Sequence, residues 1–148
     1  MTLAAPSNEI DSFEYVFLRE INELEDQRLR VVVFEGLAAA ESVTLTFGRT
    51  ELTGCHPIRP SGRIFEIVWK SYIAYCVRNE SYCGANKDDE IAVGKNFCVF
   101  SQSEFLNYIS RATFATAEYP GHFQHYGVAC QNHVIEVVSI HAPEIRQL

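Results

Sequence analysis

The chain has 148 residues, of which 47% are hydrophobic and 21% charged, so it can bury a real apolar core and is not a disordered tail. Its net charge of −7 excludes a typical nucleic-acid binder, because no basic stripe offsets the repulsion from phosphates. No apolar run reaches membrane-spanning length, and the N-terminus lacks the basic and apolar regions of a signal peptide. We therefore expect a soluble, cytoplasmic protein without a membrane partner.

The first element carries most of the charge, since residues 1–27 hold seven acidic residues and one arginine. Apolar residues recur there at helical spacing, which predicts an amphipathic helix with one buried stripe: Ile10, Phe13, Phe17, Ile21 and Leu24. The outer face of this helix would attract a basic protein surface. The residues predicted to bind that partner are Glu14, Tyr15, Glu23, Glu25 and Asp26.

The middle of the chain is rich in β-forming residues. Residues 28–36 and 42–47 are predicted strands, while residues 48–62, with their glycines and prolines, are predicted to be turn or loop. The aromatic run from residue 64 to residue 77 is either one long bent strand or two strands meeting at a bulge near Lys70.

A second helix and a hairpin follow. Ser101 and Glu104 form a capping box, which predicts a helix through Ala112. Residues 123–130 and 133–139 are separated by two residues, which predicts a tight antiparallel hairpin with Val128 opposite Ile135. Runs of strands between two helices indicate an α+β fold: a single domain over residues 1–148, with a mainly antiparallel sheet and two amphipathic helices.

The hairpin also gathers the residues most capable of chemistry. His125 and Glu136 share its outer face, which makes them a possible ligand pocket. His122 and His125 point to opposite faces if one strand carries both, so we predict no metal site and no cofactor. Cys130 and His133 flank the turn without the oxyanion donor or cleft that thiol catalysis needs, so we assign no catalytic residues. The five cysteines are odd in number and scattered, which predicts free thiols.

The pattern of the C-terminal half resembles a family of small, stand-alone, uncharacterised bacterial proteins. The resemblance rests on three stretches: residues 79–82, residues 100–106, and the closing segment from His125-Tyr126 to Pro143-Glu144-Ile145. It brings no known catalytic residues. Similar small acidic α+β proteins act as immunity partners of secreted toxins, which is an analogy of type.

From these observations we expect a non-enzymatic protein-interaction module, either an immunity-type inhibitor of a basic toxin or a protein that binds another basic partner. The alternative is a small enzyme or ligand-binding protein that uses the hairpin histidines. A concave pocket with His125, Glu136 and aromatic walls would favour the alternative, whereas a flat acidic face without a pocket would favour the interaction module.

Overall fold

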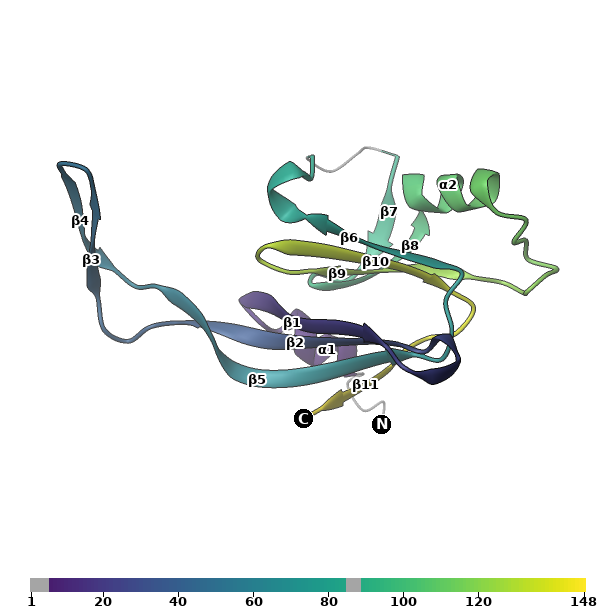
Figure 1. Cartoon of the computed structure of the whole chain (residues 1–148), viewed down its shortest axis with the longest axis horizontal. Helices are drawn as coiled ribbons and strands as arrows, with labels where there is room; N and C mark the ends of the chain where they lie inside the picture. The colour runs from purple at the N-terminus through teal and green to yellow at the C-terminus, as the bar shows by residue number, and fades with distance from the viewer. Residues whose placement is uncertain (1–5, 85–88) are drawn as a thin grey trace.

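Strands dominate the fold, because β-branched and aromatic residues recur through most of the chain. The computed structural model describes residues 6–84 and 89–148, so the first five residues, used above to argue against a signal peptide, lie outside it. Two antiparallel sheets stack face to face, and a two-stranded arm projects from one of them (Figure 1). The prediction of a mainly antiparallel sheet is confirmed.

The first sheet has four strands in the order β1-β2-β5-β11. Their bounds are Tyr15–Glu23 for β1, Leu29–Ala38 for β2, Ile58–Trp69 for β5 and Glu144–Gln147 for β11. The short helix α1 (Pro6–Asp11) precedes β1, and a 3-10 turn, η1 (Glu25–Gln27), joins β1 to β2. The arm continues the β2–β5 pair as a separate hairpin, β3 (Val43–Phe47) and β4 (Thr50–Cys55).

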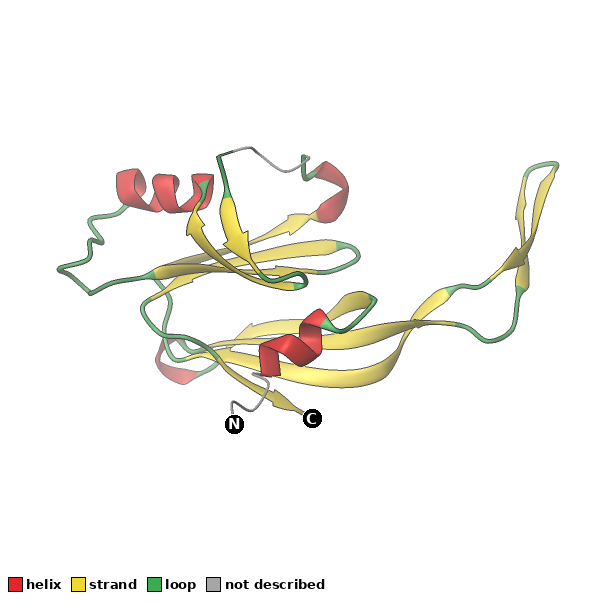
Figure 2. Ribbon diagram, turned by 180° about the vertical axis from the view of Figure 1, so that it is seen from behind, coloured by secondary structure: helices red, strands yellow, loops and turns green. Residues whose placement is uncertain are grey.

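The second sheet has five strands in the order β6-β10-β9-β8-β7. Their bounds are Ala74–Asn79 for β6, Ile91–Val93 for β7, Phe97–Gln102 for β8, Gln124–Ala129 for β9 and His133–Ser139 for β10. A 3-10 turn, η2 (Glu80–Tyr82), follows β6, and helix α2 (Glu104–Ala112) follows β8. Helix α2 covers the outer face of this sheet (Figure 2).

The core lies between the two sheets and is built from alternate residues of both. Phe65, Ile67 and Trp69 of β5 alternate along the strand and share one buried face, and Tyr126 lies with its ring centroid 5.9 Å from that of Trp69. Val128 pairs with Ile135 in the hairpin, so the predicted register is confirmed. The inner face of the hairpin is therefore apolar and belongs to the core.

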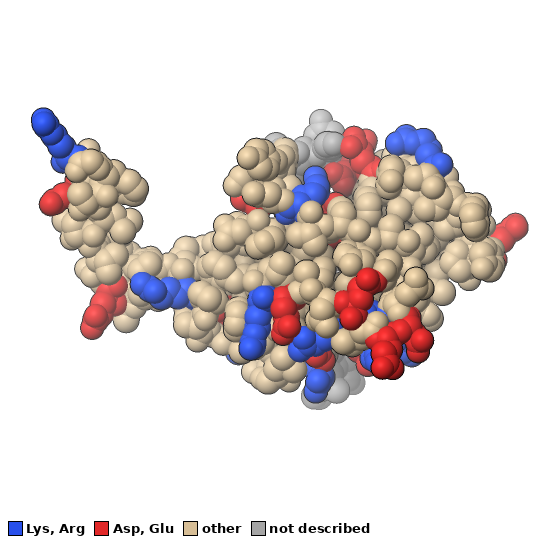
Figure 3. All heavy atoms as spheres, viewed as in Figure 1, with Lys and Arg blue, Asp and Glu red and all other residues tan. Residues whose placement is uncertain are grey.

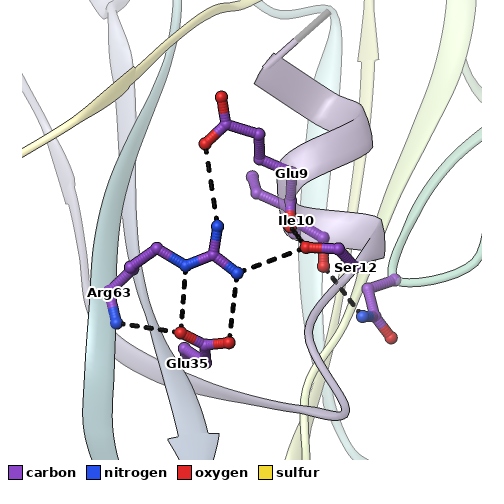
Figure 4. A network of polar contacts seen from close by, with 6 residues as sticks. Glu9, Ile10, Ser12, Glu35 and Arg63 are labelled. Carbon is purple, nitrogen blue, oxygen red and sulfur yellow. Dashed lines mark hydrogen bonds and ion pairs between the residues drawn. The ribbon is translucent and has the colours of Figure 1, made fainter. Parts of the chain in front are cut away.

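Helix α1 ties the two sheets together at one side of the sandwich. Arg63 of β5 donates to Glu35 of β2 through Nε at 3.0 Å and to Ser12 Oγ at 3.3 Å (Figure 4). From the other sheet, Asn96 Nδ2 donates to the carbonyls of Ile10 at 2.9 Å and of Phe13 at 2.8 Å. These bonds satisfy backbone groups that the end of the short helix would otherwise leave without partners.

The long N-terminal helix predicted through residue 24 is wrong. The helix ends at Asp11, and residues 15–23 form β1, which pairs antiparallel with β2. The valine-rich strand β2 needs hydrogen-bonded neighbours on both sides to be buried, and β1 supplies one of them. Tertiary pairing therefore overrides the helical spacing, and of the two predicted amphipathic helices only α2 has the expected length.

Two other expectations change with the structure. The aromatic run from residue 64 to residue 77 is two strands, β5 and β6, which lie in different sheets rather than meeting at a bulge. The predicted loop at 48–62 instead contains β4 and the start of β5. No helix within residues 6–84 and 89–148 is long and apolar enough to cross a membrane.

Candidate functional site

The outer face of the β9–β10 hairpin lies beneath α2 and holds the two residues predicted as a ligand pocket. His125 of β9 and Glu136 of β10 are adjacent there, with His125 Nε2 3.4 Å from Glu136 Oε1. The register explains this geometry, because Glu136 pairs with Gly127 and the two side chains lie on the same face. The structure thus brings together the residues that the sequence singled out.

Ser103, the residue that starts α2, anchors the helix to His125. Its Oγ accepts a hydrogen bond from the Leu106 N–H at 3.1 Å, so Ser103 is the N-cap, two residues after the predicted Ser101. The same Oγ lies 2.7 Å from His125 Nδ1. Because Oγ accepts from Leu106, its proton is available for Nδ1, and this arrangement favours the His125 tautomer with the proton on Nε2, facing Glu136.

Aromatic rings enclose the imidazole of His125. The Phe100 ring stacks on it with centroids 4.2 Å apart, and the Phe105 ring meets it edge-on at 5.2 Å. Gly127 permits this stacking, because a Cβ there would lie 2.9 Å from Phe100 Cε2. His125 is fully buried, so it lies behind the surface rather than on it.

Glu136 links this buried group to an open cleft. Its Oε2 lies 3.2 Å from Arg78 Nη2 and 3.5 Å from Cys76 Sγ. Burial alone would raise the pKa of Glu136, but the nearby His125 imidazole and the charge of Arg78 outweigh it, and the net pKa is lowered. The carboxylate is therefore ionised at neutral pH.

The cleft has a volume of about 750 Å³ and lies on the outer face of the second sheet, bordered by β6, β7 and the first residues of α2. Glu136 and Arg78 line it, together with Lys95 and the rings of Phe100 and Phe105. Cys76 also lines it, but burial raises the pKa of this thiol to about 11, so it is protonated and a poor nucleophile at neutral pH. A concave pocket with Glu136 and aromatic walls is thus present, but His125, which the sequence also placed in such a pocket, does not line it.

Ser103, His125 and Glu136 form a chain of the residue types found in hydrolytic triads, but the serine is buried and out of reach of a substrate. Ser103 is 1% exposed and His125 0% exposed, and the Ser103 oxygen already caps the helix. A nucleophile must reach a substrate carbonyl, so this chain holds α2 on the sheet rather than attacking a ligand. The group that a ligand in the cleft would meet is Glu136.

The other histidines lie away from this site. His122 and His141 are exposed, and His133 is half-buried near the hairpin turn. Within the described part of the chain, no three His, Cys, Asp or Glu side chains are grouped so as to hold a metal ion. All five cysteines are free thiols.

The predicted partner-binding residues do not share one helical face, because the helix is absent. Glu14 and Tyr15 lie at the start of β1, whereas Glu23 ends that strand and Glu25 and Asp26 follow in η1. The two groups are separated by about 25 Å, the length of a nine-residue strand. Glu23 also accepts a hydrogen bond from the Tyr72 hydroxyl. Whether these acidic residues bind a partner stays a prediction.

The arm is the surface that sequence reasoning missed. The glycines at positions 48 and 54 predicted a loop, but they serve a two-residue turn and a bulge with φ values of 60° and 71°. The available signal was the alternation of residues 43–47, which predicts a strand that needs a partner beyond the turn. By alternation and register, one face of the arm is apolar, and its large side chains are 39–62% exposed: Val43, Leu45, Phe47 and Leu52.

Comparison of the chain with protein-family models, curated proteins and solved structures found no match.

Proposed function

We propose that this protein is a non-enzymatic protein-interaction module and that the arm is its principal docking surface. The observation that carries the proposal is the exposed apolar face of β3 and β4. Phe47, near the tip, is 62% exposed, and Leu45 and Leu52 form an apolar cross-strand pair on the same face. Contiguous apolar surface of this kind marks an interaction site.

The construction of the arm supports the same function. Its opposite face carries Thr44 and Thr46 with Glu51 and Thr53, so the hairpin is amphipathic although it lies outside the sandwich core. A hydrogen bond from the Ala39 N–H to the Pro57 carbonyl, 2.8 Å, closes the base of the arm. The apolar face is therefore held at a distance from the body, where a partner can reach it (Figure 1).

The specific role expected from the sequence for this module is that of an immunity-type inhibitor of a basic toxin or of another basic partner. The carboxylates of Glu23, Glu25 and Asp26 would supply the acidic contact for such a partner. They lie where β1 ends and β2 begins, whereas the arm follows the end of β2. The proposal thus places two contact surfaces at opposite ends of the first sheet.

A photo-crosslinking side chain at position 47, in cells that make the protein, tests the arm as a docking surface. We expect a discrete crosslinked species from position 47. The matched control is position 46, which is next to it in sequence but lies on the polar face. Equal crosslinking from both positions, or none from position 47, would remove the arm from the proposal.

The alternative function, ligand binding in the cleft beside the start of α2, is favoured by the carboxylate of Glu136 at its wall. A ligand that contacts this carboxylate should raise the melting temperature of the wild type more than that of Glu136→Gln. Such a ligand would move the assignment from a module that binds proteins to one that binds small molecules.

A further inference from the structure

The arm lacks the layer that a hairpin of this kind needs. Two strands alone are marginally stable in water, and stability normally comes from further strands or from a second layer on the apolar face. Val43, Leu45 and Phe47 of β3 present that face to solvent, together with Leu52 of β4. A partner that supplies a flat apolar layer would complete the structure.

A second copy of the arm is such a layer. Two identical hairpins stacked apolar face to apolar face would form a small four-stranded sandwich, with the sheets about 10 Å apart. The contact is self-complementary, because each arm contributes the same valine, leucine and phenylalanine side chains. It therefore suits a two-fold axis, the commonest symmetry of homo-oligomers.

The charges on the arm select the antiparallel arrangement of the two hairpins. Arg49 lies in the turn between β3 and β4, at the tip, and Glu41 lies just before β3, at the base. Figure 3 shows a basic side chain at the tip of the arm and acidic side chains nearer the body. In an antiparallel stack each Arg49 meets the Glu41 of the other copy, giving two ion pairs, whereas a parallel stack would place like charges together. Two other charged residues lie outside this contact. Glu51 is the cross-strand neighbour of Thr46 on the polar face, and Arg59 lies on the body side of the Ala39–Pro57 hydrogen bond.

We propose that the partner of the arm is a second copy of this chain, bound through antiparallel stacking of the two apolar faces. The inference rests on the proposed function, since it names the partner of the same surface. Two short hairpins bury less area than the roughly 1,000 Å² expected of a stable interface. The dimer is therefore weak, with a Kd in about the micromolar range.

Sedimentation equilibrium of the full chain across about that concentration range tests the proposal. We expect a monomer–dimer equilibrium in the wild type and a monomer in Phe47→Asp, because a carboxylate would be buried in the interface. Thr46→Asp, on the opposite face of the same strand, is the matched control and should dimerise like the wild type. A wild type that stays monomeric, or a dimer that survives Phe47→Asp, overturns the proposal.

Charge exchange tests the antiparallel arrangement without touching the apolar face. Arg49→Glu and Glu41→Arg should each weaken self-association by about tenfold, since each turns two attractions into repulsions. Mixing the two variants should restore dimerisation, because the mixed dimer has opposite charges at both contacts. Failure of the mixture to associate more tightly than either variant alone overturns the arrangement.

The crosslinked species from position 47 separates failure of this inference from failure of the proposed function. A species with twice the mass of the chain supports the second copy. A species containing a different protein, with a monomeric wild type, overturns the inference but keeps the arm as a docking surface. No species from position 47 removes both.

Discussion

The carboxylate of Glu66 pairs with two arginines, one from each of the strands that flank β5 in the first sheet. It lies on the outer face of β5, where Arg30 Nε of β2 donates to Oε2 at 2.5 Å and Arg146 Nε of β11 donates to Oε1 at 2.7 Å. Hydrogen bonding from Arg30, and then from Arg146, lowers the pKa of Glu66 although burial opposes this. The ionised form of Glu66 is therefore more stable, relative to the protonated form, in the folded protein than in the unfolded chain.

The sign of the pH dependence follows from that lowered pKa. The stabilisation by Glu66 is fully present above the ordinary glutamate pKa of 4.5 and is lost as the pH falls through the lower, folded-state pKa. Glu66→Gln should lower the free energy of unfolding at neutral pH by about 1–3 kcal/mol, because it leaves two arginines without their shared partner. The difference from the wild type should shrink as the pH falls below 4.5.

Urea unfolding across a pH series measures this difference. The control is Glu51→Gln, which neutralises an exposed carboxylate on the arm and should change stability little. A gap between the wild type and Glu66→Gln that stays constant down to acidic pH would show that Glu66 acts through packing rather than through its charge.

At the scale of elements, α2 is held to the second sheet by a few specific contacts. Ile109 is its one fully buried side chain, and Phe105 packs on His125. Ser103 is central to this attachment, because its side-chain oxygen both caps the helix and forms a hydrogen bond with the buried imidazole of His125. Loss of that oxygen should therefore affect the helix and the sheet together.

Ser103→Ala tests this attachment. We expect a loss of about 2–3 kcal/mol in the free energy of unfolding, from the missing N-cap and from the buried His125 Nδ1 left without its partner. Ser101→Ala is the matched control, since Ser101 is the cap that the sequence favoured but is exposed in the structure. If the two variants unfold at the same denaturant concentration, Ser103 is not the anchor of α2.

The elements differ in how well sequence alone predicts them. The β9–β10 hairpin was predictable because its two-residue turn fixes the register locally. Strand β1 was not, because its apolar residues also fit a helical stripe, and the choice depends on pairing with β2, which is a tertiary effect. The arm was not predicted because Gly48 and Gly54 indicate a loop. In the structure the same two glycines form the turn and the bulge of a hairpin, and the sequence alone does not distinguish these cases.

The candidate site shows the same division between local and long-range information. Alternation in the hairpin placed His125 and Glu136 on one face, and that prediction needed no tertiary knowledge. The depth of His125 did not follow from the hairpin, because α2 and the ring of Phe100 bury it. The group that lines the cleft is therefore the carboxylate of Glu136, which is itself largely buried, and His125 lies behind it.

At the scale of the whole molecule, the chain crosses between the sheets and both sheets contribute to one core. β5 of the first sheet leads into β6 of the second, and the N–H of Gln131 in the hairpin turn donates to the Val16 carbonyl of β1 at 2.7 Å. The buried cluster includes Val31 and Ile67 from one sheet and Val137 from the other. Neither sheet can bury its inner face without the other.

This shared core predicts that the chain unfolds as one cooperative unit, in keeping with a single domain over residues 1–148. Trp69, the one tryptophan, is fully buried between the sheets, so its fluorescence reports the loss of the core. Circular dichroism reports the strands of both sheets. We expect the two signals to give coincident transitions in urea, because separating the sheets exposes both inner faces at once. The arm contributes no residue to the buried core, so Phe47→Asp should leave the midpoint nearly unchanged at concentrations where the wild type is monomeric. Two resolved transitions, with the fluorescence change confined to one, would show instead that the sheets fold independently and that the chain is not a single domain.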